Sequence, residues 1–282
     1  DVAKAFSGGQ IALISNHIGD MGVAFQSAFI VNRARMLSGV QLFALFNHIS
    51  HELDGLQLGG LNVVTNHNSE TFRYSKFYWM QLGLANFAWR NGDGFQMGLV
   101  NYAEDLGYAQ FGLINISKKI PQYPIGLLNL APDARGFLRA HNNRLFRYNV
   151  EMSTGSKKLL NALTYSWDNQ KKRQGFSYAL GNQKKDPRKL HNRYFYEAFA
   201  QATHLVEKGQ SIWNPNMIYS VKGQFGLNPF DHTKMPDLFF FIGIVGNASW
   251  IKSGNQELIE GPLVAQNGNR TFWADLNFGV QL

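Results

Sequence analysis

Apolar and polar residues alternate with a period of two through a short unit that recurs along the first half of the chain. In one copy, Phe95, Met97 and Leu99 fall on one face of an extended chain, while Gln96 and Gly98 fall on the other. Strict alternation of this kind predicts a β-strand with one apolar and one polar face. The unit therefore places a row of Gln beside a row of Gly, opposite an apolar row.

The unit reads approximately Gln-x-Gly-Leu-x-Asn and recurs about eight times at intervals of roughly fifteen residues. Clear copies begin at Gln57, Gln81, Gln96 and Gln110, a copy at Pro124 has lost the Gln, and weaker copies begin at Gln10, Gln26 and Gln41. A polar insertion from Asn66 to Lys76 interrupts the spacing once. A strand of about ten residues followed by a turn of about five is the period expected of a transmembrane barrel.

The second half keeps strand character but loses the repeat. In the last segment, Phe272, Leu276 and Phe278 alternate with mostly polar neighbours, which predicts a lipid-facing side opposite a polar interior. We expect strands near Leu145 to Ser153, Leu159 to Asp168, Gly175 to Asn182, Arg193 to Leu205, Asn216 to Gly226, Asp237 to Ile251 and Thr271 to Leu282.

Together these patterns predict an all-β protein, a single transmembrane antiparallel β-barrel over residues 1–282. Residues 10–130 would supply the repeat-bearing strands and residues 131–282 the longer ones. The strand tally is about fifteen, whereas bacterial barrels of one chain have even numbers, so we expect about fourteen within a range of twelve to sixteen. Either a strand near Gly136 to Ala140 is missing from the tally, or an early copy is not a strand.

Loop lengths support one orientation of this barrel, because outer-membrane barrels have short turns on one side and long loops on the other. The long connections fall on one side when strands are counted back from the C-terminus: Asn66 to Lys76, Ala131 to Asn143 and Lys252 to Arg270.

Two sets of residues would mark the lumen and the membrane interface. Inside a closed barrel the Gln row becomes a ring that either lines a pore or braces a sealed interior, formed by Gln10, Gln26, Gln41, Gln57, Gln81, Gln96 and Gln110. The Trp residues all lie near proposed strand ends, where an apolar ring with one N–H suits the headgroup level: Trp79, Trp89, Trp167, Trp213, Trp250 and Trp273. Trp near a turn can equally cap a soluble core.

Composition excludes several classes of protein. The chain is 45% hydrophobic and only 16% charged, with 22 Phe and no Cys, so disulfide scaffolds, thiolate zinc sites and cysteine catalysis are excluded. The longest apolar run, Leu238 to Val245, is far short of the roughly 18 residues that a membrane helix requires.

A net charge of +8 raises the question of nucleic acid as a partner. The basic clusters lie in proposed turns and fall on both sides of the sheet: Lys171 to Arg173, Lys184 with Lys185, and Arg188 with Lys189. Binding of nucleic acid needs one basic face with aromatic stacking platforms. We therefore expect these residues to meet lipid phosphates or lipopolysaccharide, and we expect no nucleic acid.

Candidates for chemistry are weak. His48 and His51 lie three residues apart beside Glu52, but they straddle a proposed strand end and turn, so they would not converge on a metal. Ser15 with His17, or Ser50 with His51, could imitate a lipid hydrolase on a barrel wall, although neither pair has an evident orienting acid. We assign no catalytic residue, no metal ligand and no cofactor.

The repeat resembles the surface-repeat proteins of Gram-negative bacteria, common in Bacteroidota and spirochaetes, whose units read approximately Gly-Leu-Gln-Ile-Gly-Leu-x-Asn. The similarity is carried by Gly94 to Leu106 and Ala109 to Ile116, and the segments Glu151 to Lys158 and Gly175 to Gly181 are similar to the part that follows the repeats. This resemblance implies an exported outer-membrane barrel and brings no catalytic residues. Leu282 departs from the terminal aromatic residue of many such barrels.

Our expectation is thus a porin-like channel or a membrane-embedded component of a larger assembly in the bacterial outer membrane. Its partners would be outer-membrane lipids and other outer-membrane or surface proteins. Two alternatives stay open: a lipid-modifying hydrolase on the same barrel, and a soluble β-solenoid that binds partners. The solenoid requires the strands of Gln96 and Gln110 to run parallel.

Overall fold

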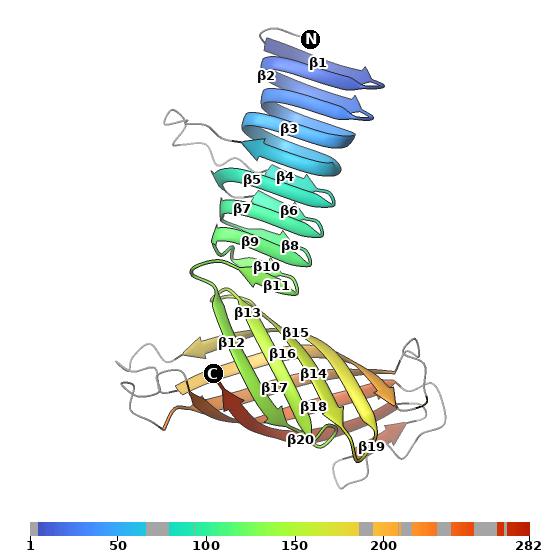
Figure 1. Ribbon diagram of the computed structural model, residues 1–282, viewed down its shortest axis with the longest axis vertical. Coiled ribbons are helices and arrows are strands. Elements are labelled where there is room, and N and C mark those ends of the chain that lie inside the picture. Colours follow the sequence, from blue (N-terminus) through green and yellow to red (C-terminus); the bar gives the residue numbers. More distant parts are fainter. Residues whose placement is uncertain are drawn as a thin grey trace. The chain divides into compact units, whose positions relative to one another are not determined.

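The computed structural model describes residues 5–65, 79–92, 94–185, 194–207, 209, 216–229, 238–250, 264–267 and 270–282 (Figure 1). Within these ranges the protein is all-β and contains no helix. The chain forms two compact units, Asp1–Ala134 and Arg135–Leu282. The two halves that the sequence distinguishes by repeat content are therefore two separate structures, one a stack of parallel coils and the other a closed barrel.

The first unit is built from short parallel strands. It begins with β1 (Ala5–Ala12), β2 (Ser15–Ala28) and β3 (Val31–Thr65), the last of which runs through more than one coil. Paired short strands complete the unit: β4 (Trp79–Leu82), β5 (Ala85–Gly92), β6 (Gly94–Met97), β7 (Val100–Leu106), β8 (Ala109–Phe111), β9 (Ile114–Lys119), β10 (Tyr123–Ile125) and β11 (Leu128–Leu130).

Equivalent positions of successive copies lie side by side. Gln96 of β6 is opposite Gln110 of β8, and Asn101 of β7 is opposite Asn115 of β9, both in parallel pairings. A parallel pairing with a constant register makes the unit a solenoid, in which each copy of the repeat forms one coil. The expectation that residues 10–130 form antiparallel barrel strands is wrong, because barrel neighbours would have to run in opposite directions.

From Gly59 onward, each coil has a Gly at its corner, whereas the earlier copies have Ala12, Ala28 and Phe43 at this position. A Cβ added to Gly98 would lie 2.5 Å from the carbonyl oxygen of Gly83 and 2.7 Å from Nδ2 of Asn86, both on the preceding coil. A Cβ added to Gly112 would likewise lie 2.5 Å from Nδ2 of Asn101 on the preceding coil. The Gly row is therefore required by the close approach of neighbouring backbones at the corner.

Two ladders of side-chain amides run along the interior of the solenoid. In one, the Nε2 of each Gln donates to the Oε1 of the Gln on the preceding coil, as from Gln96 to Gln81 at 2.8 Å and from Gln110 to Gln96 at 2.8 Å. In the other, the Nδ2 of each Asn donates to the Oδ1 of the next coil, as from Asn86 to Asn101 at 2.8 Å. These buried amides satisfy one another, so the polar interior carries little desolvation penalty.

Apolar side chains fill the rest of the solenoid interior. A cluster of buried residues includes Ile18, Leu37, Ile49, Leu53 and Leu106, all less than 3% exposed. Burial of these side chains supplies the hydrophobic stabilisation, and the ladders fix the register of one coil on the next.

The second unit is a closed barrel of eight antiparallel strands. In order around the barrel they are β12 (Arg135–Asn142), β13 (Tyr148–Gly155), β14 (Leu160–Asp168), β15 (Arg173–Lys185), β16 (Tyr194–Glu207), β17 (Met217–Leu227), β18 (Phe239–Trp250) and β20 (Arg270–Gln281). Pairing of Ala140 with Val280 closes the sheet, and β19 (Val264–Asn267) pairs antiparallel with the start of β20. The expected count of about fourteen strands is not found.

The strands expected in the second half are confirmed. The seven predicted segments correspond to β13 through β18 and to β20, and β12 occupies the place near Gly136 to Ala140 where a strand was suspected. The segment Ala131 to Asn143 is therefore not a long loop, since most of it is β12. The other two expected long loops, Asn66 to Lys76 and Lys252 to Arg270, lie wholly or largely outside the described residues.

Candidate functional site

Strand alternation gives the barrel a polar interior and an apolar wall. On β17, Ser220, Lys222 and Gln224 are buried, whereas the alternate residues Tyr219 and Val221 are exposed. On β20, Asn277 and Gln281 face inward, whereas Leu276 and Phe278 face outward. The alternation predicted for the final strand is thus present, and it extends to the neighbouring strands.

Arg139 of β12 lies at the centre of the barrel interior and is 1% exposed. Its Nη1 donates to Oε1 of Glu151 at 2.8 Å, its Nη2 donates to Oε2 of Glu197, and its Nε donates to Oε1 of Gln281 at 3.0 Å. Glu151 also accepts from Nζ of Lys222 at 3.3 Å. One guanidinium therefore joins strands β12, β13, β16 and β20 across the lumen, and each buried charge has a partner of opposite sign.

Aromatic rings surround the same guanidinium. The Cζ of Arg139 lies 4.4 Å from the ring centroid of Phe137, 5.5 Å from that of Phe241 and 5.6 Å from that of Phe195. Phe195, Phe239 and Phe241 form a buried cluster of their own. Cation–π contacts and apolar packing thus complete the cross-section of the barrel at this level.

A second apolar cluster fills another part of the barrel interior and consists of Leu145, Phe146, Leu205, Ile218 and Trp273. A small polar cavity of about 30 Å³ is lined by residues that include Phe146, Ile218, His141 and Lys222. A cavity of this size holds about two waters. Gln201 Oε1 and Asn277 Oδ1 also line the cavity and have no hydrogen-bond partner among the described residues, so ordered water would complete their bonding.

The interior of the barrel is therefore occupied across its section. An eight-stranded barrel is just wide enough for its own side chains to fill. Here the charged centre and three apolar clusters do so, the third formed by Leu160, Ala162, Ala179 and Phe199.

The outer wall is apolar and free of charge between the strand ends. Exposed outward residues include Val150, Val221, Ile242, Ile244 and Phe278. Among the outward strand positions whose side chains are described, Lys and Arg occur only near strand ends, at Lys184 and Arg270, and Asp and Glu do not occur.

Aromatic residues gather on the wall at both ends of β15. Near its start, Trp167 stacks on Tyr148 and on Tyr165, with ring centroids 5.5 Å apart in each pair. Near its end, on the neighbouring strands, the rings of Tyr194 and Tyr196 lie 5.8 Å and 5.3 Å from Phe225. The outer wall therefore carries a group of aromatic rings near each end of this strand.

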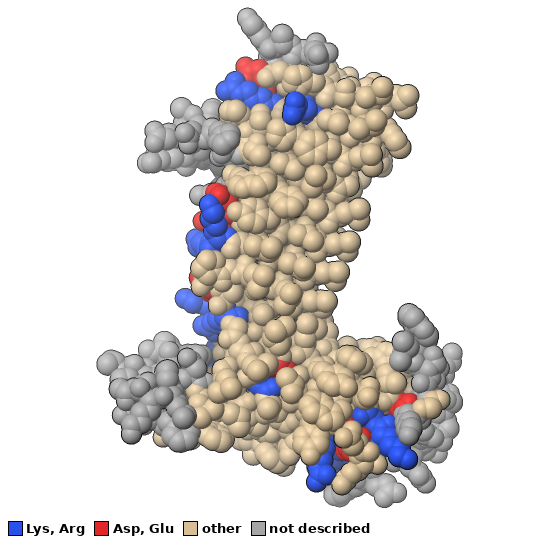
Figure 2. Space-filling model, in the orientation of Figure 1, with Lys and Arg blue, Asp and Glu red and all other residues tan. Residues whose placement is uncertain are grey.

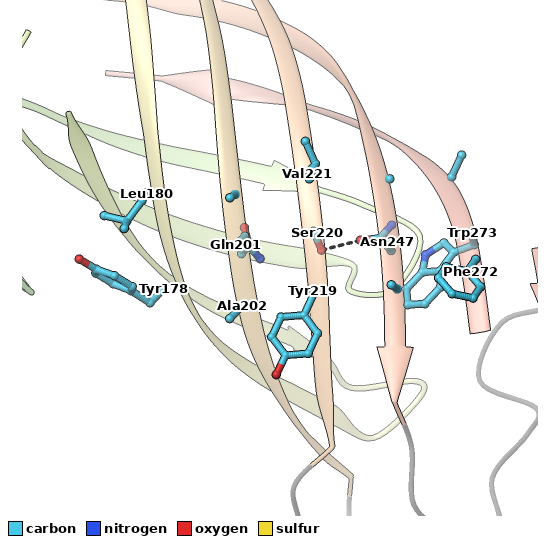
Figure 3. Close-up of a pocket in the computed structure, with 14 residues that line it drawn as sticks. Tyr178, Leu180, Gln201, Ala202, Tyr219, Ser220, Val221, Asn247, Phe272 and Trp273 are labelled. Atoms are coloured by element: carbon cyan, nitrogen blue, oxygen red, sulfur yellow. Dashed lines mark hydrogen bonds between the residues drawn. The ribbon is translucent and has the colours of Figure 1, made fainter. Parts of the chain in front are cut away.

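A hollow of about 820 Å³ lies on the wall across β15 to β18 and β20 (Figure 3). Large side chains such as Tyr178, Tyr219 and Phe272 stand beside small ones such as Ala202 on adjacent strands. The alternation of large and small residues from strand to strand leaves the space between them open.

The Gln residues expected in a barrel lumen lie in the solenoid instead. Gln26, Gln41, Gln57, Gln81, Gln96 and Gln110 are fully buried there, and Gln10 at the first coil accepts from Gln26 at 2.9 Å. These Gln residues do hydrogen-bond to one another, as the bracing role requires. They join coils of the solenoid, however, and do not line the lumen of the closed barrel.

The Trp residues divide between the units. Trp79 and Trp273 are buried, at 4% and 3% exposure, so their side chains do not lie at a barrel surface. Trp89 is exposed but belongs to β5 of the solenoid. Trp167 lies on the outer wall of the barrel near the end of β14, while Trp213 and the side chain of Trp250 lie outside the described residues.

The Ser and His candidates all lie in the solenoid, so they do not project from the barrel wall. Ser50 Oγ is 3.4 Å from Nδ1 of His51 on β3. His48 stacks on Phe46 and approaches Thr65 Oγ1 at 3.2 Å, and burial followed by the nearby charge of Arg33 lowers the pKa of its imidazole. In the described part of the chain, no group of three or more His, Asp or Glu is arranged to hold a metal ion.

No family of proteins, curated protein or solved structure matches this chain. Among the residues that the structure describes, there is no helix with the length and apolar character needed to cross a membrane.

Proposed function

We propose that the chain is an outer-membrane protein whose eight-stranded barrel is embedded in the bilayer and carries the solenoid as part of a larger surface assembly. The observation that carries this proposal is the pairing of a charge-free apolar wall with a polar, ion-paired interior on one closed sheet. A soluble barrel would instead carry charged side chains over its outer face.

Backbone pairing supports the same proposal. A bilayer provides no water to unpaired backbone groups, and a closed antiparallel sheet leaves none along its strands. Six of the eight barrel strands have 9 to 14 residues, and about 9–11 tilted residues span a bilayer. The hollow beside Tyr219 would then be filled by lipid chains.

Contacts with anionic lipid follow from the basic residues at the strand ends. Lys171 and Lys172 lie in the turn between β14 and β15, and Lys184 lies near the far end of β15. In the proposed orientation they meet phosphates of lipid headgroups or lipopolysaccharide at the two membrane surfaces. Contacts between these Lys residues and lipid phosphates would account for the basic clusters without a nucleic-acid partner.

Between a porin-like channel and an embedded component of an assembly, the filled interior favours the second. Arg139 and its carboxylate partners cross the lumen, and the apolar clusters occupy the space on either side of this centre along the strands. We therefore propose an anchor that presents a repeat surface to other outer-membrane or surface proteins.

Membrane insertion is tested by exporting the chain in a Gram-negative host and isolating its outer membrane. We expect the protein to resist alkaline extraction, to need detergent for solubility, and to migrate differently on gels before and after boiling. A folded, monodisperse protein without detergent would contradict the proposal. Planar-bilayer recording then separates anchor from channel: we expect no steady conductance, and a stable open level would show a channel.

A further inference from the structure

One end of the barrel has a step in its rim, where β12 stops short of its neighbour β20. Asn142, the last residue of β12, lies opposite Phe278, so β20 continues beyond β12 over residues 270–277. The short strand β19 pairs with the same edge of β20 only over residues 270–273. No described strand pairs with this edge over residues 274–277, so the barrel wall has a gap beside the turn that joins β12 to β13.

One carboxylate bridges this gap. Oδ2 of Asp275 accepts a hydrogen bond from the backbone N–H of Arg144 in the turn, and Oδ1 accepts one from the backbone N–H of Leu276 on β20, both at 2.8 Å. Asp275 therefore holds the turn against β20 without restoring the strand pairing. Hydrocarbon does not satisfy an incompletely paired sheet edge, so in a bilayer the gap calls for an occupant that carries polar groups.

A hollow of about 580 Å³, which we call the rim hollow, lies at the gap. Its side formed by β18 and β20 is apolar and includes Ile244, Leu276 and Phe278, which are 66%, 60% and 58% exposed. Its other side is formed by the end of β12 and the following turn, and it includes Asn142 and Arg144. A hollow in which an apolar surface meets a cation fits an amphiphile with an anionic head.

Positive charge reaches the rim hollow from two neighbouring turns. Arg144 is exposed, and Nζ of Lys171, in the turn between β14 and β15, donates to the carbonyl oxygen of Arg144 at 3.0 Å. Figure 2 shows Lys and Arg side chains gathered at this end of the barrel, beside an uncharged stretch of wall. Among the described residues that line the hollow, Asp275 is the one acid, and both of its carboxylate oxygens already accept from backbone N–H groups. Two cations thus stand beside one acid.

We propose that the rim hollow binds one phospholipid molecule. Its phosphate accepts hydrogen bonds from the guanidinium of Arg144 and from the ammonium of Lys171, which has donors to spare beyond its bond to the turn. One acyl chain lies along the apolar side of the hollow, against Ile244 and Leu276. One pair of cations beside one hollow fits a lipid with a single phosphate. This inference rests on the proposed insertion of the barrel into a membrane, to which it adds the class of lipid that is held and the place that holds it.

The test is native mass spectrometry of the full chain released from detergent micelles, after titration with dioleoyl phosphatidylglycerol. We expect one retained lipid per chain, and weaker retention of dioleoylglycerol, which has the same chains and no phosphate. Arg144→Gln together with Lys171→Gln should lower retention of phosphatidylglycerol about tenfold, because charge-assisted hydrogen bonds to the phosphate are lost. The backbone N–H of residue 144 remains, so its bond to Asp275 is kept.

A matched control removes two positive charges at the other end of the barrel. Lys157 and Lys158 are exposed in the turn between β13 and β14. Lys157→Gln with Lys158→Gln should retain phosphatidylglycerol like the unmodified chain.

A second variant fills the rim hollow without changing any charge. Ala274 lines the hollow on β20, and Ala274→Trp should lower retention of both lipids. The change of gel mobility on boiling verifies that each variant keeps a folded barrel.

Three results would overturn the inference: equal retention of phosphatidylglycerol by the two Lys and Arg variants, equal retention of the lipids with and without phosphate, and selective displacement by lipopolysaccharide, which would make that molecule the occupant. Failure of the membrane proposal is distinguished from these results by alkaline extraction of the unmodified chain from the outer membrane. A protein that is extracted refutes insertion itself, whereas an embedded protein whose retention of lipid ignores Arg144 and Lys171 refutes the rim hollow alone.

Discussion

Pro124 lies in register with Gln110 on the adjacent strand and ends the glutamine ladder. Gln110 donates to Gln96, but its own Oε1 is buried and has no hydrogen-bond partner among the described residues, because Pro124 offers no side-chain amide. The asparagine ladder continues one coil further, since Asn115 donates to Asn129 at 2.8 Å.

This difference predicts unequal costs for the same substitution at two positions of one ladder. Gln96→Met removes the donor to Gln81 and the acceptor of Gln110, and we expect it to destabilise the local coils by about 3 kcal/mol. Gln110→Met removes one ladder bond and also the unpaired oxygen, so we expect a cost of about 1 kcal/mol. Hydrogen exchange of β6 and β8 amides measures both, and equal losses of protection would refute the ladder as the cause.

Close approach at the solenoid corner predicts a steep response to one methyl group. Gly98→Ala would place Cβ 2.5 Å from the carbonyl oxygen of Gly83, and we expect a cost of about 2 kcal/mol or more from the resulting backbone shift. Gly9→Ala is the control in the same unit, since nothing lies within 4 Å of its added Cβ. Thermal unfolding of the two variants should differ clearly, and matching curves would contradict the corner geometry.

Removal of the central guanidinium should unfold the barrel at much lower denaturant concentration. Arg139→Met leaves the buried carboxylate of Glu197 without its ionic partner and leaves Glu151 with Lys222 alone, and such a loss costs about 3–5 kcal/mol. Adding Glu197→Gln removes the carboxylate left without an ionic partner, so the double variant should regain part of the loss. Urea unfolding followed by gel mobility of unboiled samples measures both, and additive losses would argue against coupling.

If the apolar wall faces a bilayer, the stability cost of a Lys on this wall should depend on its distance from the strand ends. Ile244 lies outward in the interior of β18 and is 66% exposed, so Ile244→Lys in a bilayer should cost about 2–4 kcal/mol. Gln174→Lys, outward near the start of β15, should cost about 1 kcal/mol or less because it lies near the interface. Refolding into lipid vesicles at graded urea concentrations compares the two, and equal stability of both variants would count against a membrane.

The barrel half follows closely from sequence because antiparallel strands of an inside-out barrel have a strong period of two. Phe272 to Val280 alternates with polar neighbours in the sequence as it does in the structure. The weakest strand was β12, where the outward positions include Gly136 and Ala140 and the apolar signal is correspondingly faint.

The solenoid half was assigned the right strand character and the wrong topology. Alternation predicts that Gln96 and Met97 face opposite sides of the strand, and the structure confirms this. Alternation carries no information on whether neighbouring strands run parallel or antiparallel. The discriminating signal was the identity of the repeat itself, since Gln must meet Gln and Asn must meet Asn to form ladders. In an antiparallel barrel, successive strands run in opposite directions, so neither their sequences nor those of their turns need to repeat.

The charged centre of the barrel was missed altogether. Arg139, Glu151 and Lys222 stand in different strands, and only the closed sheet brings them together. Each of them does occupy a polar-face position of an alternating strand, which is the signal that could have marked them as buried. Their pairing depends on strand order and shear, which a single sequence does not specify.

The two amide ladders point in opposite directions, with Gln donating toward the N-terminal coil and Asn toward the C-terminal coil. Each coil therefore adds one amide of each orientation, and the two contributions oppose each other along the axis. Whole coils can then be gained or lost by recombination between copies without electrostatic imbalance or a change of register. The number of coils therefore sets the length of the solenoid without changing its cross-section.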